Sequence, residues 1–374
     1  MVAKFDDHPF IAIWETTQAC DLVCQHCRAC AKPTRDPSEL STAEGKRVLD
    51  SLAAAHVPLV ILTGGDPAKR PDLLELVAHG RSRGLIMGLT PSATPLVTPE
   101  LIGELAQAGL ARLAVSVDAP GAAIHDAFRG VAGSFDMSLR ILRDAKAAGI
   151  GTQINTSIHA KNIHILKEMA EVVRDAGCLL WSVFFVVPTG RAGLSMMPSP
   201  SAVESALEEL AALAEREPFA VKTTAAPHYR RVLAEKKRAS GVAAEHGTHG
   251  KQGVRVNDGR GFLFVSHRGE VFPSGFLPIP CGNVRERDVI EIYRTSPVFL
   301  ELRDAERLLG KCGACEYKQL CGGSRARAYA VSGELHDWDG LCAYVPPGYE
   351  AEFERDQRQR DEQLGRVALA VVNG

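Results

Sequence analysis

Short apolar segments alternate with amphipathic ones over the first half of the chain, and this alternation limits the possible folds more than any other feature. Each apolar run is short and bounded by turn residues, which is typical of strands buried on both faces. Amphipathic segments between the runs are expected to be helices. The apolar runs are FIAIWET, LVILT, LIMGLT, ARLAVSV, TQINTSI and LLWSVFFVV. The helices are expected near residues 42–56, 72–83, 98–108, 136–148 and 163–176.

Local signals mark where these helices begin and end. Ser41 and Glu44 have the spacing of a capping box at the start of the first helix. Gly109, Gly149 and Gly177 lie where three later helices must stop. The alternation therefore predicts about six β/α units in a parallel α/β layout, and ligands of such sheets bind at the carboxyl ends of the strands.

Three cysteines, Cys20, Cys24 and Cys27, follow the first apolar run in the stretch CDLVCQHC. A tetrahedral zinc site needs four ligands, usually from two separated pairs, so this loop alone is one ligand short. Three thiolates on one loop suit an iron–sulfur cluster in which one iron has no protein ligand. His26 and Cys30 lie nearby, and loop packing is the simpler interpretation of each.

Composition sets the outer limits on partners and location. The chain has 374 residues with 45% hydrophobic content, enough for a large core and two domains. Its formal charge of −2 gives no net attraction to nucleic acid or to an anionic membrane. No apolar stretch is long enough to span a bilayer, and the start MVAKFDDHPF lacks the features of a secretion signal. We expect a cytoplasmic protein without nucleic-acid or membrane partners, in reducing surroundings where disulfides are rare.

Small and polar residues collect at the ends of the expected strands. Taken singly, each has a simple explanation as a turn, a helix cap or a core amide. Together they line one rim of the sheet, where a small zwitterionic ligand would find acceptors and donors. They are Gly64, Gly65 and Asp66 after the second run, Ser116 and Asp118 after the fourth, and Asn155 in the fifth.

The pattern changes after residue 200. One more helix is expected over residues 199–217, followed by a basic and Gly/His-rich stretch. His246 and His249 in that stretch are most simply loop residues, with contact to a substrate or a metal as the alternative. The runs VRVND, GFLFVS and GEVFPS, with hairpin turns at residues 257–259 and 267–269, then predict the start of a smaller domain.

A second group of cysteines closes this domain with the pattern CxxCx5Cx20C. Four thiolates can complete a structural zinc site, and they can also hold a 4Fe–4S cluster, so the spacing leaves both open. The four are Cys312, Cys315, Cys321 and Cys342.

Several motifs together resemble the radical S-adenosylmethionine (SAM) superfamily: ETTQACDLVCQHC, TGGDP, SVDAP with the following FRGVAGSF, and VPTGRAG. The likeness runs over nearly all of residues 9–345. It implies a partial (β/α)6 barrel of the TIM type and an enzyme that reductively cleaves SAM to a 5′-deoxyadenosyl radical, which removes a hydrogen atom from substrate. It also implies a flavodoxin- or ferredoxin-type reductant.

The resemblance assigns roles to individual residues. Cys20, Cys24 and Cys27 would be the ligands of a 4Fe–4S cluster, with the amino nitrogen and carboxylate of SAM on the open iron. Asp66 stands where Glu is more usual, which shortens its reach by one methylene. The implied SAM contacts are His26 for adenine, Gly64, Gly65 and Asp66 for the methionine amino group, and Ser116, Asp118 and Asn155 for the ribose or carboxylate.

The segment CGACEYKQLCGGSRARAYAVSGELHDWDGLC resembles the C-terminal SPASM/twitch extension of the superfamily, which implies an auxiliary 4Fe–4S cluster on the second cysteine group. Ser274 and Arg325 stand where a full SPASM pattern has cysteines, which favours one auxiliary cluster over two. Cys281 could substitute for a missing ligand of the auxiliary cluster, although a structural role for its thiol is the simpler interpretation. Cys178 is expected to be a buried core residue. The implied divisions are a radical SAM core at 9–198, a helical connector at 199–253, a SPASM/twitch domain at 254–345 and a tail at 346–374.

The combination of WETTQACDLVCQHCRA with CGGSRARAYAVSG is most similar to the branch of radical haem b synthases and haem d1 enzymes. That likeness implies oxidative decarboxylation of propionates on an iron coproporphyrin-like tetrapyrrole. Arg325 and Arg327 would pair with propionates, or else belong to an ion-pair network on a helix surface. A maturase of a ribosomally made peptide is the alternative. A third class is a non-catalytic iron–sulfur or zinc scaffold. The three-cysteine loop argues against it, because a scaffold has no reason to leave a coordination site vacant.

Overall fold

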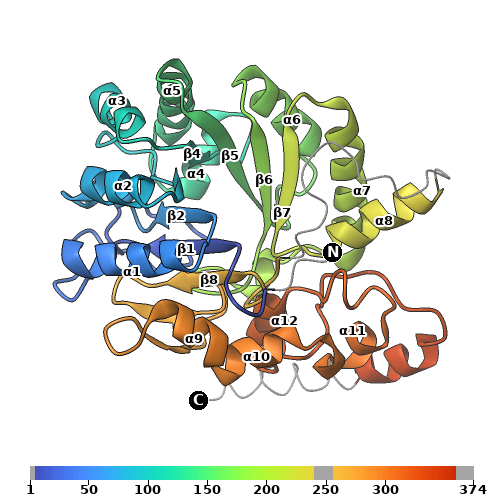
Figure 1. Cartoon of the computed structure of the whole chain (residues 1–374). Coiled ribbons are helices and arrows are strands. Elements are labelled where there is room, and N and C mark those ends of the chain that lie inside the picture. The colour runs from blue at the N-terminus through green and yellow to red at the C-terminus, as the bar shows by residue number, and fades with distance from the viewer. Residues whose placement is uncertain (1–4, 240–255, 359–374) are drawn as a thin grey trace, which may run out of the picture.

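The computed structural model describes residues 5–239 and 256–358, and its centre is a ten-stranded sheet (Figure 1). The strand order is β10-β9-β8-β1-β2-β3-β4-β5-β6-β7. Strands β1 to β8 are parallel, whereas β9 and β10 run antiparallel to their neighbours. The strands are β1 (Ile11–Glu15), β2 (Leu59–Thr63), β3 (Ile86–Leu89), β4 (Arg112–Ser116), β5 (Gly151–Ile158), β6 (Leu180–Phe185), β7 (Ala220–Thr224), β8 (Phe262–Val265), β9 (Glu270–Phe272) and β10 (Gly282–Asn283).

Helices α1 to α7 lie along the outer side of the parallel strands, and α9 to α12 gather in the C-terminal part, orange to red in Figure 1. The helices are α1 (Thr42–Ala54), α2 (Leu73–Ser82), α3 (Pro99–Gln107), α4 (Ala122–Arg129), α5 (Ser134–Ala147), α6 (Leu166–Asp175), α7 (Pro200–Arg216), α8 (Tyr229–Ala239), α9 (Val289–Thr295), α10 (Pro297–Arg303), α11 (Gly310–Ala314) and α12 (Arg325–Ser332). Short 3₁₀ turns are η1 (Pro67–Lys69), η2 (Leu194–Met196) and η3 (Ala305–Arg307).

The two faces of the parallel sheet differ in chemistry. Side chains that point toward the helices, such as Trp14, Leu62 and Trp181, form one buried hydrophobic core. Residues of β5 alternate, so that Ile154 is buried in this core while Asn155 points to the opposite, partly open face. The helices therefore cover one face and leave the other to line the inside of a partial barrel.

The local signals for the first half of the fold are confirmed. All six expected strands form, and the capping box at the start of α1 has both of its hydrogen bonds, between Ser41 and Glu44. Gly109, Gly149 and Gly177 adopt φ values of +88°, +79° and +64° just after three helices, a conformation that glycine takes most readily.

Two elements differ from the sequence-based expectation. The segment 199–253, expected as a helical connector, contains a seventh parallel strand, β7, paired with β6. Strand β8, expected to start a separate domain, instead pairs in parallel with β1 in the same sheet. The apolar run FLFV thereby satisfies the backbone of β1, which would otherwise be an open edge. The stretch containing His246 and His249 lies outside the described residues.

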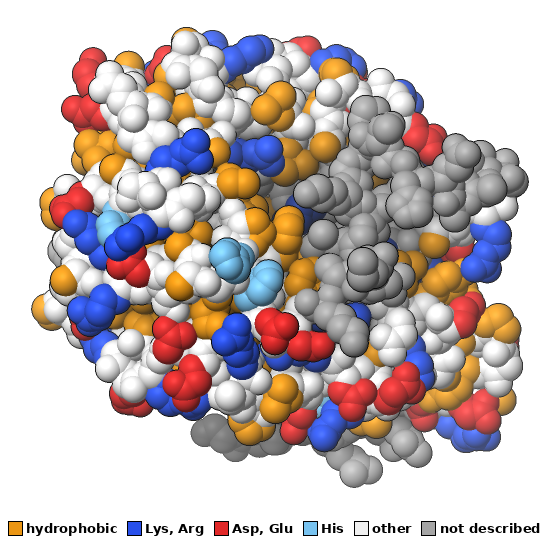
Figure 2. Space-filling model, viewed as in Figure 1, with side chains coloured by type: hydrophobic (Ala, Val, Ile, Leu, Met, Phe, Trp, Pro, Cys, Tyr) orange, Lys and Arg blue, Asp and Glu red, His pale blue; other side chains and the backbone are white. Residues whose placement is uncertain are grey.

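The surface offers few further constraints. Acidic and basic side chains are interspersed on the face shown in Figure 2, in keeping with the formal charge of −2. Within residues 5–239 and 256–358, no helix combines the length and the apolar character that crossing a membrane requires.

Candidate functional site

The loop after β1 brings its three cysteines together at the carboxyl end of the sheet. Cys20 and Cys24 are buried and pack with Leu22 in a small cluster that Cys27 joins. Backbone groups hold the sulfurs in place, since the N–H of Leu22 donates to Cys20 Sγ (3.3 Å) and the N–H of Ala31 to Cys27 Sγ (3.5 Å). The arrangement leaves three neighbouring thiols that could bind one metal cluster.

The two glycines after β2 allow this loop to pack closely against the next one. A Cβ on Gly64 would lie 2.5 Å from the carbonyl oxygen of Thr17, and one on Gly65 would lie 2.3 Å from that of Ala19. The N–H of Gly65 donates to the Thr17 carbonyl at 2.7 Å. The glycines therefore let the backbone approach the cysteine loop, and their predicted contact with a ligand stays a prediction.

Asp66 is buried and organises the same region. Its carboxylate accepts hydrogen bonds from Thr94 Oγ1 (2.7 Å) and from the backbone N–H groups of Ala68 (3.1 Å) and Ser92 (3.3 Å). Burial raises the pKa of this carboxyl group despite these donors. Three protein donors already bind this carboxylate. Its contact with the methionine amino group of SAM stays a prediction.

Asp118 pairs with a protein cation at the end of β4. Arg129, the last residue of α4, donates from Nε to Asp118 at 2.6 Å and from Nη1 to Cys24 Sγ at 3.7 Å. The N–H of Ser157 donates to the other carboxylate oxygen at 2.7 Å. Burial alone would raise the pKa of Asp118, but the Arg129 guanidinium outweighs it, so the pKa lies below its usual range. Asp118 thus fixes a positive charge beside Cys24, and its predicted contact with SAM is not tested.

His26 lies in an aromatic stack. Its ring is 4.2 Å from that of Phe128 with an interplanar angle of 2°, and Phe128 also stacks on His159. Its Nε2 lies 3.1 Å from Ser157 Oγ. Burial lowers the pKa of His26 to about 3, and the charge of Arg129 acts in the same direction, so the ring is neutral near pH 7. Phe128 occupies one face of the ring, which leaves the other for the predicted adenine contact.

Ser116 and Asn155 are register partners on neighbouring strands and point to the open face of the sheet. The side chain of Gln153 donates to Asn155 Oδ1 at 2.7 Å. These two predicted SAM contacts therefore lie side by side at the rim that carries the three-cysteine loop.

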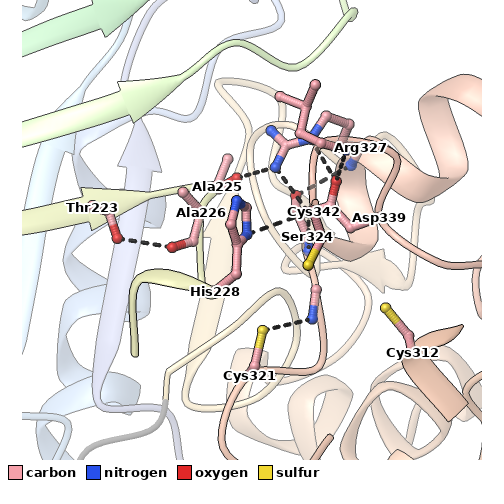
Figure 3. A network of polar contacts seen from close by, with 12 residues as sticks. Thr223, Ala225, Ala226, His228, Cys312, Cys321, Ser324, Arg327, Asp339 and Cys342 are labelled. Carbon is pink, nitrogen blue, oxygen red and sulfur yellow. Dashed lines mark hydrogen bonds and ion pairs between the residues drawn. The ribbon is translucent and has the colours of Figure 1, made fainter. Parts of the chain in front are cut away.

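The second cysteine group lines one cavity of about 370 Å³, counting the part open to solvent. Its walls carry all four thiols, together with Arg231, Lys311 and two tyrosines. Figure 3 shows three of these cysteines, Cys312, Cys321 and Cys342. Within the described ranges, no three Cys, His, Asp or Glu side chains stand as ligands of a single ion. Each thiolate of a 4Fe–4S cluster binds a different iron, so the sulfurs need not meet at one point.

Arg325 and Arg327 are both buried in the C-terminal part of the chain. Arg327 is completely buried, and donates to both carboxylate oxygens of Asp339 and to the carbonyls of Val186 and Ala225 (Figure 3). Arg325 is 3% exposed, donates to the carbonyl of Asp337 at 2.6 Å and approaches Cys312 Sγ at 3.9 Å. Arg327 is thus in an ion pair and Arg325 is bonded mainly to backbone carbonyls, and their contact with propionates stays a prediction.

The remaining thiols are those of Cys30, Cys178 and Cys281. Cys178 belongs to the main core, and Cys281 packs against the same core and donates to the carbonyl of Ile279 at 3.5 Å. Neither Cys281 nor the buried Ser274 lines the four-cysteine cavity. Cys30 is exposed, with a φ of +47°. This placement agrees with the structural interpretation of Cys281.

Sequence reasoning missed two residues that contact the first cysteine group. Arg129 lies in the motif FRGVAGSF, and a charged residue within a motif could have indicated a role at the site. Ser92, whose hydroxyl oxygen is 3.2 Å from Cys20 Sγ, had no such signal, because it comes from the loop after β3.

Comparison with known proteins agrees with this geometry. A model of the radical SAM superfamily matches residues 14–177. The chain is 38% identical over 340 residues to the AdoMet-dependent heme synthase of Methanosarcina barkeri (strain Fusaro / DSM 804), covering 90% of this chain and 97% of the relative. It is 40% identical over 337 residues to the AdoMet-dependent heme synthase of Nitratidesulfovibrio vulgaris (Hildenborough), covering 89% and 92%.

The fold is similar to a solved structure as well. SuiB of Streptococcus suis, bound to S-adenosylmethionine, superposes with a TM-score of 0.70 at 15% identity, covering 90% of this chain and 78% of that one. The fold, the three-cysteine loop and the relatives together define an enzyme that works with a 4Fe–4S cluster and SAM. The chain belongs to the radical SAM superfamily.

Proposed function

We propose that this enzyme oxidatively decarboxylates propionate side chains of an iron porphyrin of the coproporphyrin type. The observation that carries the proposal is its identity of 38% and 40% to two AdoMet-dependent heme synthases over about nine-tenths of the chain. The four-cysteine cavity in the C-terminal part supports it, because an oxidative reaction needs a place for the electron that it releases.

The cofactor sites follow from the two cysteine groups. Cys20, Cys24 and Cys27 hold the first 4Fe–4S cluster and leave one iron to the amino nitrogen and carboxylate of SAM. The rim around them supplies the contacts to SAM. Cys312, Cys315, Cys321 and Cys342 would hold one auxiliary 4Fe–4S cluster in a SPASM/twitch region that follows the strands of the main sheet. A flavodoxin- or ferredoxin-type protein in the cytoplasm supplies electrons.

The reaction balances for each propionate. When bound, the first cluster and SAM supply a 5′-deoxyadenosyl radical, which takes one hydrogen atom from the carbon β to the carboxylate. The bond to the carboxylate carbon then breaks, carbon dioxide leaves, a vinyl double bond forms and one electron remains. A cluster held by Cys312, Cys315, Cys321 and Cys342 would be able to take up that electron and pass it to a one-electron protein acceptor. The protein's part is to hold the propionate near the SAM rim and to exclude other hydrogen donors.

The proposal is tested with anaerobically reconstituted enzyme, dithionite, SAM and iron coproporphyrin. We expect carbon dioxide and 5′-deoxyadenosine to form in equal amounts, well above the background without porphyrin. The tetramethyl ester of the same porphyrin is the control, because it has no free carboxylate to lose. If the porphyrin releases no carbon dioxide while a candidate precursor peptide raises 5′-deoxyadenosine formation, the peptide-maturase alternative replaces this proposal.

A further inference from the structure

Lys222 lies on the open face of the sheet, in line with two of the predicted SAM contacts. In the strand register, Ser116 pairs with Asn155, Asn155 with Ser182, and Ser182 with Lys222. Register partners point to the same side of a sheet, and Val221, the residue before Lys222, packs against the core on the other side. The lysine therefore belongs to a cross-strand row that runs over the inner face from β4 to β7.

The inner face around this row carries several polar side chains, with Leu180 and Phe184 on either side of Ser182 in β6. Gln153 and Ser157 on β5 share the face with Asn155, and Thr224 on β7 shares it with Lys222. The interior of a closed (β/α) barrel is usually filled with layers of bulky branched side chains. Amides, hydroxyls and an ammonium group in that position are the residue types that bind a polar ligand.

Lys222 has positive neighbours and no acidic partner among the described residues. None of the ion pairs found there includes its ammonium group. The Lys222 side chain is exposed to solvent on this open face of the sheet. Desolvation by the surrounding protein lowers its pKa, and the guanidinium groups of Arg230 and Arg112 lower it further. An anion bound to Lys222 would be attracted by all three positive charges. The arrangement therefore fits a negatively charged ligand.

Arg230 extends this positive region toward the second cysteine group. It donates from Nη1 to the carbonyl of Leu320, next to Cys321, at 3.3 Å. It also lines a cavity of about 410 Å³, counting the part open to solvent, that Cys321 borders. A ligand anion near Lys222 would thus lie between the SAM rim, marked by Asn155, and the four-cysteine cavity.

We propose that Lys222 is the anchor for a carboxylate of the substrate, on the inner face of the barrel. The proposal rests on the function proposed above, and it supplies a cation for a substrate propionate in addition to Arg325 and Arg327, whose guanidinium groups make internal contacts. The carboxylate accepts hydrogen bonds from the Lys222 ammonium, and the nearby guanidinium charges favour further propionates.

Equilibrium binding of iron coproporphyrin, followed by its absorption spectrum in anaerobic reconstituted enzyme, tests the proposal. Lys222→Met should weaken binding about ten- to a hundredfold, and Lys222→Arg should restore most of it, because the charge returns. Lys167→Met is the matched control, since Lys167 is 72% exposed on α6, and it should bind the porphyrin as the wild type does. The porphyrin tetramethyl ester should bind wild type and Lys222→Met equally.

Two results would overturn the assignment of Lys222. One is Lys222→Met binding porphyrin as tightly as the wild type while the wild type still decarboxylates it, which leaves the proposed function intact. The other is Lys222→Met losing SAM affinity but not porphyrin affinity. If Lys222→Met does not fold, the wild-type enzyme alone tests the assignment. Equal affinities for the porphyrin and for its tetramethyl ester would exclude a carboxylate anchor. A wild type that neither binds nor decarboxylates porphyrin overturns both proposals together.

Discussion

Arg327 and Asp339 form a two-pronged ion pair with no exposed surface, with Nε to Oδ1 at 2.8 Å and Nη2 to Oδ2 at 2.9 Å. The arginine also reaches the carbonyls of Val186, just after β6, and Ala225, just after β7. Asp339 accepts from the backbone N–H of Ser324, close to the four-cysteine cavity (Figure 3). The pair therefore ties the rim of the barrel to the second cysteine group.

Removing one member of this pair should be costly. Arg327→Met leaves the Asp339 carboxylate buried without its partner, which we expect to lower the free energy of unfolding by about 3–5 kcal/mol. Urea denaturation measures the change. The control is Arg287→Met, which removes an exposed ion pair with Glu291 and should cost less than about 0.5 kcal/mol. Equal effects of the two changes would contradict a structural role for the Arg327 pair.

The iron content should reflect two clusters. Reconstituted protein should hold about eight irons as two 4Fe–4S clusters. Changing Cys20, Cys24 and Cys27 together to Ala should halve this number, because the second group is built from other elements. Metal analysis is the measurement. About four irons with one zinc in the unmodified protein would rule out the auxiliary cluster.

The first cluster should keep its open iron when the second group is removed. With Cys312, Cys315 and Cys321 changed to Ala, SAM should still perturb the paramagnetic resonance spectrum of the reduced protein, because a fourth protein ligand is missing only at the first site. The same addition to the Cys20, Cys24 and Cys27 variant is the control and should change nothing. If SAM does not change the spectrum of the Cys312, Cys315 and Cys321 variant, direct binding of SAM at the open iron is excluded.

A methyl group on Gly65 should displace the cysteine loop. Its Cβ would lie 2.3 Å from the carbonyl oxygen of Ala19, a contact with backbone that cannot move aside locally. We expect Gly65→Ala to lose about half of the iron, from the first site alone. Gly103→Ala on α3 is the control, because nothing lies within 4 Å of its added Cβ, and it should stabilise the helix by about 0.5–1 kcal/mol. Full iron occupancy in Gly65→Ala would show that the loops can separate.

Much of the fold is readable from local patterns. The six apolar runs became strands because each is short, β-branched and closed by turn residues, and these properties need no distant partner. Strand β7, with the sequence AVKTT, escaped prediction because its inner face is polar and its apolar content is low. Helix α4 was not predicted because it is only eight residues long and directly precedes α5.

The composition of the site was also readable, whereas its contacts were not. Spacing alone grouped Cys20, Cys24 and Cys27, because ligands on one loop are close in any fold. The contact of Arg129 with Cys24 spans 105 residues, and that of Ser92 with Cys20 spans 72, so each depends on how strands order themselves in the sheet.

Local sequence thus specifies which segments are strands and which loops carry thiols, because backbone propensity and ligand spacing act over a few positions. The roles of the charged residues depend on the folded chain. Arg327 is buried in an ion pair and Lys222 faces the inside of the barrel, because their surroundings depend on how β6, β7 and the C-terminal segment meet in space. Those encounters join residues that are far apart in sequence, where no local pattern can record them.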